Sequence, residues 1–258
     1  MSRDRENPAP GGDAEAKASF GFRDVPEAEK ASLVRAVFDN VAPKYDLMND
    51  LMSVGIHRLW KREMVEQLRP RADKMLLDVG GGTGDIAFRF RDRGGGPVIV
   101  CDINHDMLEV GRDRAIDGNH MVGIDWVCGD AENLPVADSS VDAYSIAFCM
   151  RNVTRIDAAL MEAKRVLKPG GYFLCLEFSK VGLPLLERLY DIYSFNVLPW
   201  LGANVAGDRD SYVYLAESIR RFPDQESYAE RIAAAGLDHV RVRNLSGGIA
   251  ALHGAWRL

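Results

Sequence analysis

The 258-residue chain carries 32 Lys and Arg against 38 Asp and Glu, so its net charge of −6 provides no overall basic field for nucleic acid. A content of 47% hydrophobic and 27% charged residues is ordinary for a soluble globular protein, and no apolar stretch approaches the ~18–20 residues that span a bilayer. The cysteines show neither CxxC spacing nor Cys/His pairing, which predicts reduced thiols and no metal site: Cys101, Cys128, Cys149 and Cys175.

The N-terminal residues, roughly Met1 to Phe20, contain several acids and no apolar h-region. Neither a secretory signal nor a transit peptide fits this composition. We therefore expect a disordered tail over residues 1–20, a single domain over residues 21–258, and a cytoplasmic location.

Helical spacing of apolar residues begins after the tail, in the segment Pro26 to Phe38. The next segment, Val41 to Leu68, is expected to form two helical pieces around Ser53–Gly55. Together they predict an N-terminal helical lid over about residues 27–68. Three of its polar side chains either pack the lid onto the domain or close over a substrate: Tyr45, Asp46 and His57.

The stretch Met75 to Asp85, MLLDVGGGTGD, predicts a strand, a tight glycine turn and a helix start. Glycine permits positive φ and lets a ligand lie against the main chain. A dinucleotide fingerprint would require a third glycine where Asp85 stands, and a carboxylate there would oppose a pyrophosphate. The pattern D-x-G-x-G-x-G, from Asp78 to Gly84, instead resembles motif I of S-adenosylmethionine (SAM) methyltransferases.

Strand and helix patterns then alternate. Four further strands are expected at Pro97–Asp102, Ile124–Cys128, Val141–Ala147 and Tyr172–Phe178, with helices near residues 85–93, 105–115 and 157–167. This order predicts a parallel sheet with ligands outside the carboxyl ends of its strands. The polar residues expected at that edge are Asp78–Gly84, Asp102, Asp130–Ala131 and Arg151–Asn152.

Two strand-end acids suit a nucleoside. Asp102 lies twenty residues after Gly82, where a carboxylate accepts hydrogen bonds from both ribose hydroxyls; Asn104 can cap the next helix in its place. At the Asp130–Ala131 corner, the carboxylate can accept from an adenine amino group while the Ala131 N–H donates to a ring nitrogen.

Residues 181–207 contain only Glu187, Arg188 and Asp191 as charges. They predict a helix from about Leu185 to Val197 followed by a Pro–Trp–Leu–Gly turn, within a hydrophobic insertion of about residues 181–222. This segment is either a buried helix pair, a lid for a lipophilic substrate, or a face resting on a membrane. Helices near residues 212–221 and 225–235 and a closing hairpin, residues 239–245 and 249–256, complete the chain.

Two longer segments, Tyr45 to Trp60 and Arg165 to Ser179, resemble the signatures of the quinone-biosynthesis C-methyltransferases, as do MRNV at Met150 to Val153 and the terminal NLSGGIAALH. The resemblance runs from about Phe38 to the C-terminus. It implies a class I SAM-dependent methyltransferase fold, an α/β Rossmann-like, mostly parallel seven-stranded sheet whose C-terminal hairpin supplies one antiparallel strand.

The resemblance also implies a site and partners. SAM would be held by residues of motif I and the strand ends: Asp78, Gly80, Gly82, Thr83, Asp102, Asp130 and Ala131. Many family members have a serine where Ala147 stands, so that contact is not carried over. The substrate would be a lipophilic polyprenylated quinol, either a benzoquinol or demethylmenaquinol. Contact with the inner membrane, a quinone-biosynthesis complex and a homodimer are further partners that the resemblance leaves open.

C-methylation needs a deprotonated quinol whose ring carbon attacks the methyl group. We expect Arg151 and Asn152 to stabilise the phenolate or order a proton-accepting water, because arginine itself stays protonated. Tyr45 and His57 are further catalytic candidates from the lid. The alternatives are an NAD-dependent oxidoreductase, which Asp85 disfavours, and a non-catalytic SAM-binding assembly factor.

Overall fold

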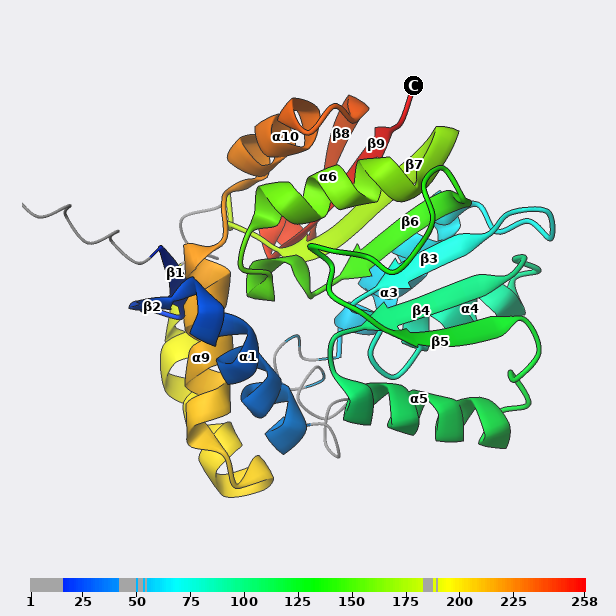
Figure 1. Ribbon diagram of the computed structural model, residues 1–258. Helices are drawn as coiled ribbons and strands as arrows, with labels where there is room; N and C mark the ends of the chain where they lie inside the picture. Colours follow the sequence, from blue (N-terminus) through cyan, green and yellow to red (C-terminus); the bar gives the residue numbers. More distant parts are fainter. Residues whose placement is uncertain (1–15, 42–49, 51–52, 54, 183–187, 189) are drawn as a thin grey trace, which may run out of the picture.

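The computed structural model describes residues 16–41, 50, 53, 55–182, 188 and 190–258. A seven-stranded sheet crosses its centre in the order β5-β4-β3-β6-β7-β9-β8 (Figure 1). β9 runs antiparallel to both of its neighbours, and the other adjacent strands are parallel. The predicted fold is confirmed, including its single antiparallel strand. The strands are β3 (Leu76–Val79), β4 (Val98–Asp102), β5 (Ile124–Cys128), β6 (Val141–Ala147), β7 (Leu167–Phe178), β8 (Asp238–Leu245) and β9 (Ala250–Trp256).

The order of the strands decides where a ligand can bind. The chain builds β3, β4 and β5 outward in one direction and then returns to place β6 on the other side of β3. The connections leaving β3 and β6 therefore diverge, and a crevice opens at the carboxyl ends of these strands. The glycine turn after Val79 and the residues after Ala147 both begin at this crevice.

Alternating apolar side chains bury the two faces of the sheet separately. Leu76 packs into the core under α3 (His57–Leu68) and α4 (Asp85–Asp92), whereas Leu77 packs into the core under α6 (Ile156–Val166) and α10 (Gln225–Ala234). This alternation is the two-residue period of a strand covered on both sides. The helix α5 (His105–Asp117) follows β4 and lies along the edge formed by β4 and β5 (Figure 1).

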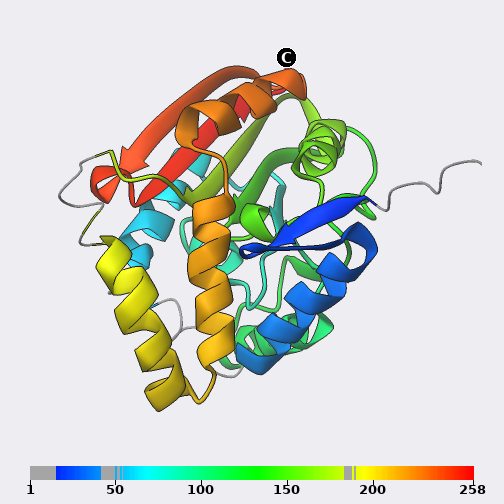
Figure 2. The same ribbon diagram turned by 90° about the vertical axis from the view of Figure 1, so that its left-hand side faces the viewer.

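A second layer covers the carboxyl edge of the sheet. It contains the hairpin β1 (Lys17–Phe20) and β2 (Arg23–Pro26), followed by α1 (Glu27–Val41) and α9 (Arg209–Arg221). In Figure 2 the hairpin lies across α9, with α1 beside it. The expected tail of residues 1–20 is therefore too long, because Lys17–Phe20 form a strand whose Ala18 and Phe20 side chains are buried. A short strand with two inward side chains is too weak a pattern to separate from a tail.

The hydrophobic insertion also departs from expectation. A turn was expected at Pro199–Gly202, but the chain stays helical through Tyr193–Val197, α8 (Leu198–Leu201) and Gly202–Ala206. Pro199 has no N–H to donate, and the Leu198 N–H bonds to Tyr193 O, five residues back. The helix widens to a π-type turn at the proline and does not end there. It ends at Gly207, with φ of 77°, and Asp208 then caps α9.

The remaining short elements join the strands at their ends. A 3-10 turn, η2 (Met150–Asn152), follows β6, and another, η5 (Ser246–Gly248), closes the last hairpin. Within the part of the chain that the structure describes, no helix is long and apolar enough to cross a membrane.

Candidate active site

The glycine turn after β3 brings the main chain close to its neighbours. Gly80 has φ of +60°, and a Cβ there would lie 2.3 Å from the Cys149 sulfur. Gly82 has φ of +51°, and a Cβ there would lie 3.0 Å from the Met107 side chain. A larger residue would be strained at either position, and at Gly80 it would also collide with Cys149, so glycine is strongly favoured in this turn.

Asp102, at the end of β4, is fixed against this turn. One carboxylate oxygen accepts from the Gly82 N–H at 2.9 Å, and the other accepts from the Asn104 N–H at 2.8 Å. Asn104 caps α5 by accepting from the Met107 N–H, so Asp102 is spared that task as expected. Each carboxylate oxygen keeps a further lone pair. Burial raises the pKa of Asp102 to about 6, which leaves the group mainly ionised at neutral pH.

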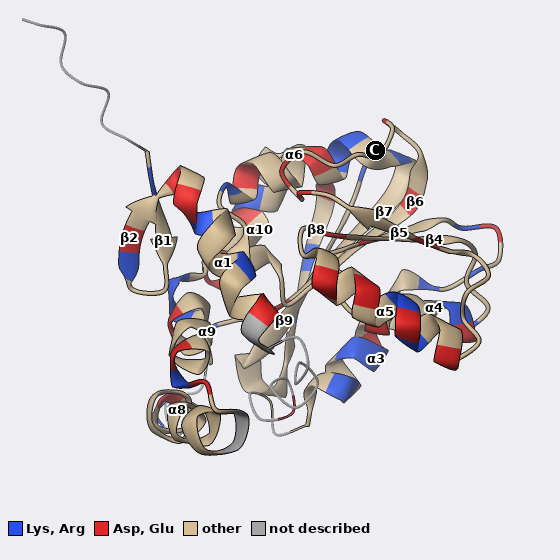
Figure 3. Cartoon of the chain, turned by 60° about the horizontal axis from the view of Figure 1, so that its bottom comes forward, with Lys and Arg blue, Asp and Glu red and all other residues tan. Residues whose placement is uncertain are grey.

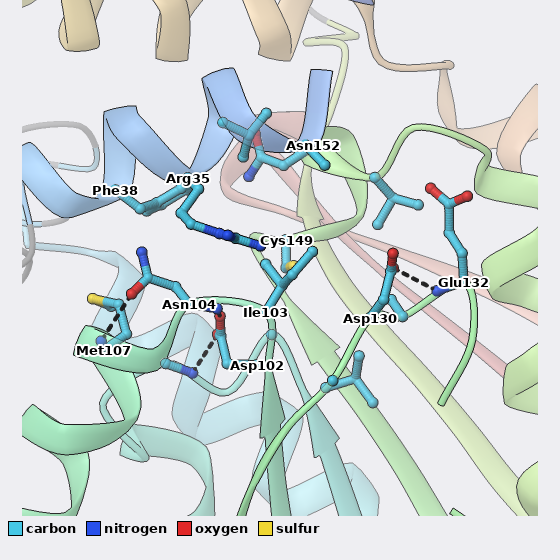
Figure 4. A pocket seen from close by; sticks show the side chains of 18 of the residues that line it. Arg35, Phe38, Asp102, Ile103, Asn104, Met107, Asp130, Glu132, Cys149 and Asn152 are labelled. Carbon is cyan, nitrogen blue, oxygen red and sulfur yellow. Dashed lines mark hydrogen bonds between the residues drawn. The ribbon is translucent and has the colours of Figure 1, made fainter. Parts of the chain in front are cut away.

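A cavity with roughly 820 Å³ of empty space, part of it open to solvent, lies over these strand ends (Figure 4). Its floor is the glycine turn and the residues that follow β4 and β5. Its roof is α1, whose apolar residues face the floor. Six of the expected site residues line it: Gly80, Gly82, Asp102, Asp130, Ala131 and Asn152.

Asp78 and Thr83, two expected cofactor contacts, lie behind the cavity wall. Asp78 is 1% exposed and accepts a hydrogen bond from Ser145 of β6 at 2.7 Å. Its other oxygen would lie 2.9 Å from a Cβ on Gly81, so the carboxyl group sits against the glycine turn. Thr83 is buried and accepts from Arg114 at 2.7 Å. Among the described residues, both support the turn and neither lines the cavity.

Asp85 is occupied by two cations. Its carboxylate lies 2.8 Å from the Lys61 ammonium group of α3 and 2.7 Å from the Arg89 guanidinium. Although burial opposes ionisation, Lys61 and then Arg89 bring the pKa of Asp85 to about 2. The two cations therefore compensate the negative charge of the carboxylate, and the ion pair with Lys61 joins α3 to the start of α4. The repulsion of a pyrophosphate expected from the sequence is weakened accordingly.

Of the three polar residues expected in the lid, the structure describes His57. Tyr45 and Asp46 lie outside the described residues. His57 is 4% exposed, and its Nδ1 is 2.9 Å from Ser53 Oγ. Burial, together with the nearby Lys61 charge, lowers the pKa of His57 to about 4, so the ring is neutral at physiological pH. It is not among the residues lining the cavity.

Arg151 and Asn152 share the η2 turn but face different surroundings. The Arg151 guanidinium is 2.8 Å from Glu177 of β7, with side chains 2% and 1% exposed, and it also donates to the Phe148 carbonyl. It lies 5.5 Å from the centre of the Phe178 ring. Arg151 borders a smaller pocket that it shares with Lys30 and Tyr214, whereas Asn152 lines the large cavity.

The roof supplies residues that the sequence did not single out as site residues. Arg35 of α1 reaches over the floor toward Cys149 in Figure 4. It forms no hydrogen bond or ion pair with any described residue, and it is the cavity's lone cation among them. The other described charges on the wall are Asp102, Asp130 and Glu132. The helical spacing that placed Val34 and Phe38 on one face was the available signal, because Arg35 adjoins that face.

The comparisons with known proteins agree with this architecture. The model of the ubiE/COQ5 methyltransferase family matches residues 19–257. A Paracoccus denitrificans protein named ubiquinone/menaquinone biosynthesis C-methyltransferase UbiE is 58% identical over 93% of this chain and 96% of its own. The mouse mitochondrial 2-methoxy-6-polyprenyl-1,4-benzoquinol methylase is 50% identical over 94% and 85%. A solved SAM-dependent methyltransferase from Thermotoga maritima, 20% identical, superposes with a TM-score of 0.62 over 87% and 100% of the chains.

The buried Arg151–Glu177 pair generates a stability prediction. Arg151→Ala would leave Glu177 charged and unpaired, which we expect to cost about 3–5 kcal/mol of unfolding free energy. Burial raises the pKa of Glu177, so the loss should shrink as the pH is lowered, because a neutral carboxyl group costs less to bury. Urea denaturation at acidic and at neutral pH measures both effects.

Arg62→Ala is the matched control, because its ion pair with Glu66 is exposed on α3. Its unfolding free energy should stay close to that of the parent. The double variant Arg151→Met/Glu177→Gln should recover much of the loss, since no buried charge remains. If the single and double variants were equally unstable, the pairing would not be the cause.

Proposed function

The chain belongs to the ubiE/COQ5 methyltransferase family and is a SAM-dependent C-methyltransferase, and we propose that it methylates the ring of a polyprenylated quinol. The two candidate substrates are 2-methoxy-6-polyprenyl-1,4-benzoquinol and demethylmenaquinol. The names of the bacterial and mouse relatives support this class of substrate. The observation that carries the proposal is the Asp102 carboxylate held by two backbone N–H groups beside the glycine turn, on the floor of the cavity.

The groups on the floor and roof of the cavity fit the parts of SAM. Asp102 has lone pairs for the two ribose hydroxyls, and the Asp130–Ala131 corner suits the adenine. The zwitterionic methionine end carries a carboxylate. Arg35 is a cation without a described partner, and it points toward Cys149, which lies against Gly80. SAM would therefore lie with its nucleoside on Asp102 and its carboxylate toward Arg35.

SAM supplies an electrophilic methyl group, and the chain has to make the ring carbon nucleophilic. A quinol carbon gains electron density as the neighbouring hydroxyl loses its proton. The Asn152 amide faces the cavity and can donate to the oxygen that becomes negative. Arg151 lies behind Asn152, paired with Glu177, so its contribution is to support the turn. The apolar roof residues Val34 and Phe38 keep water from the ring.

Methyl transfer tests the function directly. Purified protein incubated with methyl-labelled SAM should transfer the label to carbon on a short-tailed 2-methoxy-benzoquinol or demethylmenaquinol, kept reduced by dithionite. Comparing the two quinols would select between the candidate substrates. SAM binding without transfer to either ring would instead support a non-catalytic assembly factor.

Arg35→Ala tests the orientation of the cofactor. Removing this cation should weaken SAM and S-adenosylhomocysteine by roughly 5–10-fold, since Arg35 is exposed and its charge is partly screened. Binding of 5′-methylthioadenosine, which has no carboxylate, should not change. Isothermal titration calorimetry with the three ligands makes the comparison.

Arg112→Ala, which removes an exposed cation from α5, is the control and should leave all three affinities unchanged. If Arg35→Ala lowered the affinity for all three ligands equally, Arg35 would contact the nucleoside and not the carboxylate. If the affinity for SAM did not change, Arg35 would not contact the cofactor.

The hydrophobic insertion supports a further part of the proposal, contact with a lipid bilayer. Tyr190, Ser194 and Leu198 face inward, each at most 8% exposed. The opposite side exposes Ile192, Phe195, Val197 and Trp200. Residues 192–207 carry no charge, which Figure 3 shows as an uncharged ribbon through α8. The expectation of a buried helix pair therefore describes one side of the segment only.

Two asparagine side chains of this segment donate hydrogen bonds within it. The Asn196 and Asn204 side-chain amides donate to the carbonyls of Ile192 and Trp200, four residues back. Satisfied amides lower the cost of entering an apolar phase. A polyprenyl tail resides in a bilayer, so an enzyme acting on its head group benefits from resting on that surface.

Vesicle flotation tests the bilayer contact. The parent protein should float with phosphatidylcholine–phosphatidylglycerol vesicles. Phe195→Ser/Trp200→Ser should remain at the bottom, because it removes from the apolar face two aromatic rings that are 39% and 62% exposed. Met161→Ser, an exposed apolar residue on α6, is the control and should float. Equal flotation of all three proteins would show that another surface contacts the bilayer. If the parent did not float, the proposed bilayer contact would be wrong.

A further inference from the structure

Asn152, which lines the cavity, carries a buried donor that has no partner among the described residues. The residue is 7% exposed, yet its Nδ2 has no hydrogen-bond partner among the described residues. In Figure 4 the nitrogen end of the amide lies on the side of Arg35 and Cys149. A buried N–H group without a partner costs free energy, so such a group on a cavity wall indicates a ligand atom that completes it.

Tyr214 of α9 contacts the oxygen end of this amide. The Tyr214 hydroxyl donates to Asn152 Oδ1 at 3.0 Å. A carboxamide has an acceptor end and a donor end, so engaging the oxygen turns the nitrogen toward the cavity. Tyr214 is 4% exposed, and burial raises its pKa well above the ordinary value, so the hydroxyl stays protonated and keeps donating.

Tyr214 is itself held by the N-terminal hairpin. The Phe20 ring of β1 stacks on the Tyr214 ring, with centroids 4.2 Å apart and planes at 21°. The hairpin is fastened to the same helix, because the Phe22 N–H donates to Glu217 at 3.0 Å and Arg221 donates to the Phe22 carbonyl at 3.2 Å. The ring therefore has little freedom to withdraw its hydroxyl.

The main chain after Asn152 is held as well. Lys30 of α1 donates to the Val153 carbonyl at 2.8 Å. Glu132 accepts from the N–H groups of Thr154 and Arg155, both at 2.9 Å. With its backbone fixed from two sides, Asn152 has its side-chain rotation as the remaining freedom, and Tyr214 removes it.

We propose that Tyr214 is a positioning residue for methyl transfer: it holds the Asn152 amide with its N–H toward the reacting ring oxygen, and the β1–β2 hairpin braces it there. This rests on the proposed function, in which Asn152 donates to the quinol oxygen. Without the hydroxyl the amide can turn over and present its own oxygen to the developing negative charge, which opposes deprotonation.

The variant Tyr214→Phe tests this, because it removes one hydroxyl and keeps the stacked ring. We expect kcat for methyl transfer to the short-tailed quinol to fall on the order of tenfold, with the KM for SAM unchanged. The apparent pKa on the acid side of the kcat profile should rise, because the phenolate is less stabilised. A purely structural role would not move this pKa.

Tyr212→Phe is the matched control. Tyr212 lies on the same helix, is 1% exposed, and its hydroxyl has no hydrogen-bond partner among the described residues. This variant should keep the parent kcat and pH profile. Phe20→Leu removes the brace and should shift kcat and the pH profile in the same direction as Tyr214→Phe, by a smaller factor.

A double-mutant cycle completes the test. Asn152→Ala should lower kcat at least as much as Tyr214→Phe, and the double variant should be no slower than Asn152→Ala alone. Losses that multiply would show that Tyr214 acts independently of Asn152 and would overturn the proposal, as would full activity of Tyr214→Phe. If the parent itself transferred no methyl group to either quinol, the proposed function would fail, a result separate from either of these.

Discussion

The hydrogen bond from the Gly82 N–H to the Asp102 carboxylate is the contact on which the site depends. It joins the ends of two parallel strands across twenty residues of sequence and places a fixed negative charge under the cavity. The bond requires the main chain to turn sharply after Val79 with positive φ values, which glycine adopts at the least cost. Asn104 caps α5 in place of Asp102, so the acid is left for a ligand. The alternate glycines, the strand-end acid and the separate helix cap therefore act together to hold one free carboxylate on the cavity floor.

Much of this arrangement could be predicted from the sequence, because its residues lie in short sequence patterns. A glycine turn after an apolar run and acids at strand ends are visible in short windows, and the parallel order then brings them to one edge. Asp78 and Thr83 show the limit of such prediction. Both stand in the motif, but whether a motif residue faces a ligand or supports the turn depends on the register with the next strand. Asp78 pairs across to Ser145 of β6, a contact between residues 67 positions apart.

The roof of the site was harder to foresee. Helical spacing identified the apolar face of α1 but could not say what that face covers, since any buried surface would satisfy the pattern. The hairpin β1–β2 was mistaken for a tail because four residues with two inward side chains carry almost no periodic signal. Its stability comes from α9, through Phe20 on Tyr214 and Phe22 on Glu217, nearly two hundred residues away. No local pattern contains such contacts.

Arg151 and Asn152 were expected to act together, and their surroundings separate them. A free guanidinium directly beside the reacting ring would bind a phenolate strongly, but it would also attract water and other anions to the ring. Pairing Arg151 with Glu177 beneath Phe178 keeps the charge of Arg151 away from the ring. The wall then offers a neutral amide dipole, which stabilises charge as it develops and requires little solvation beforehand. An amide has one donor end and one acceptor end, so it stabilises a negative oxygen only when its N–H points toward that oxygen. An amide in this role therefore needs a positioning group such as Tyr214.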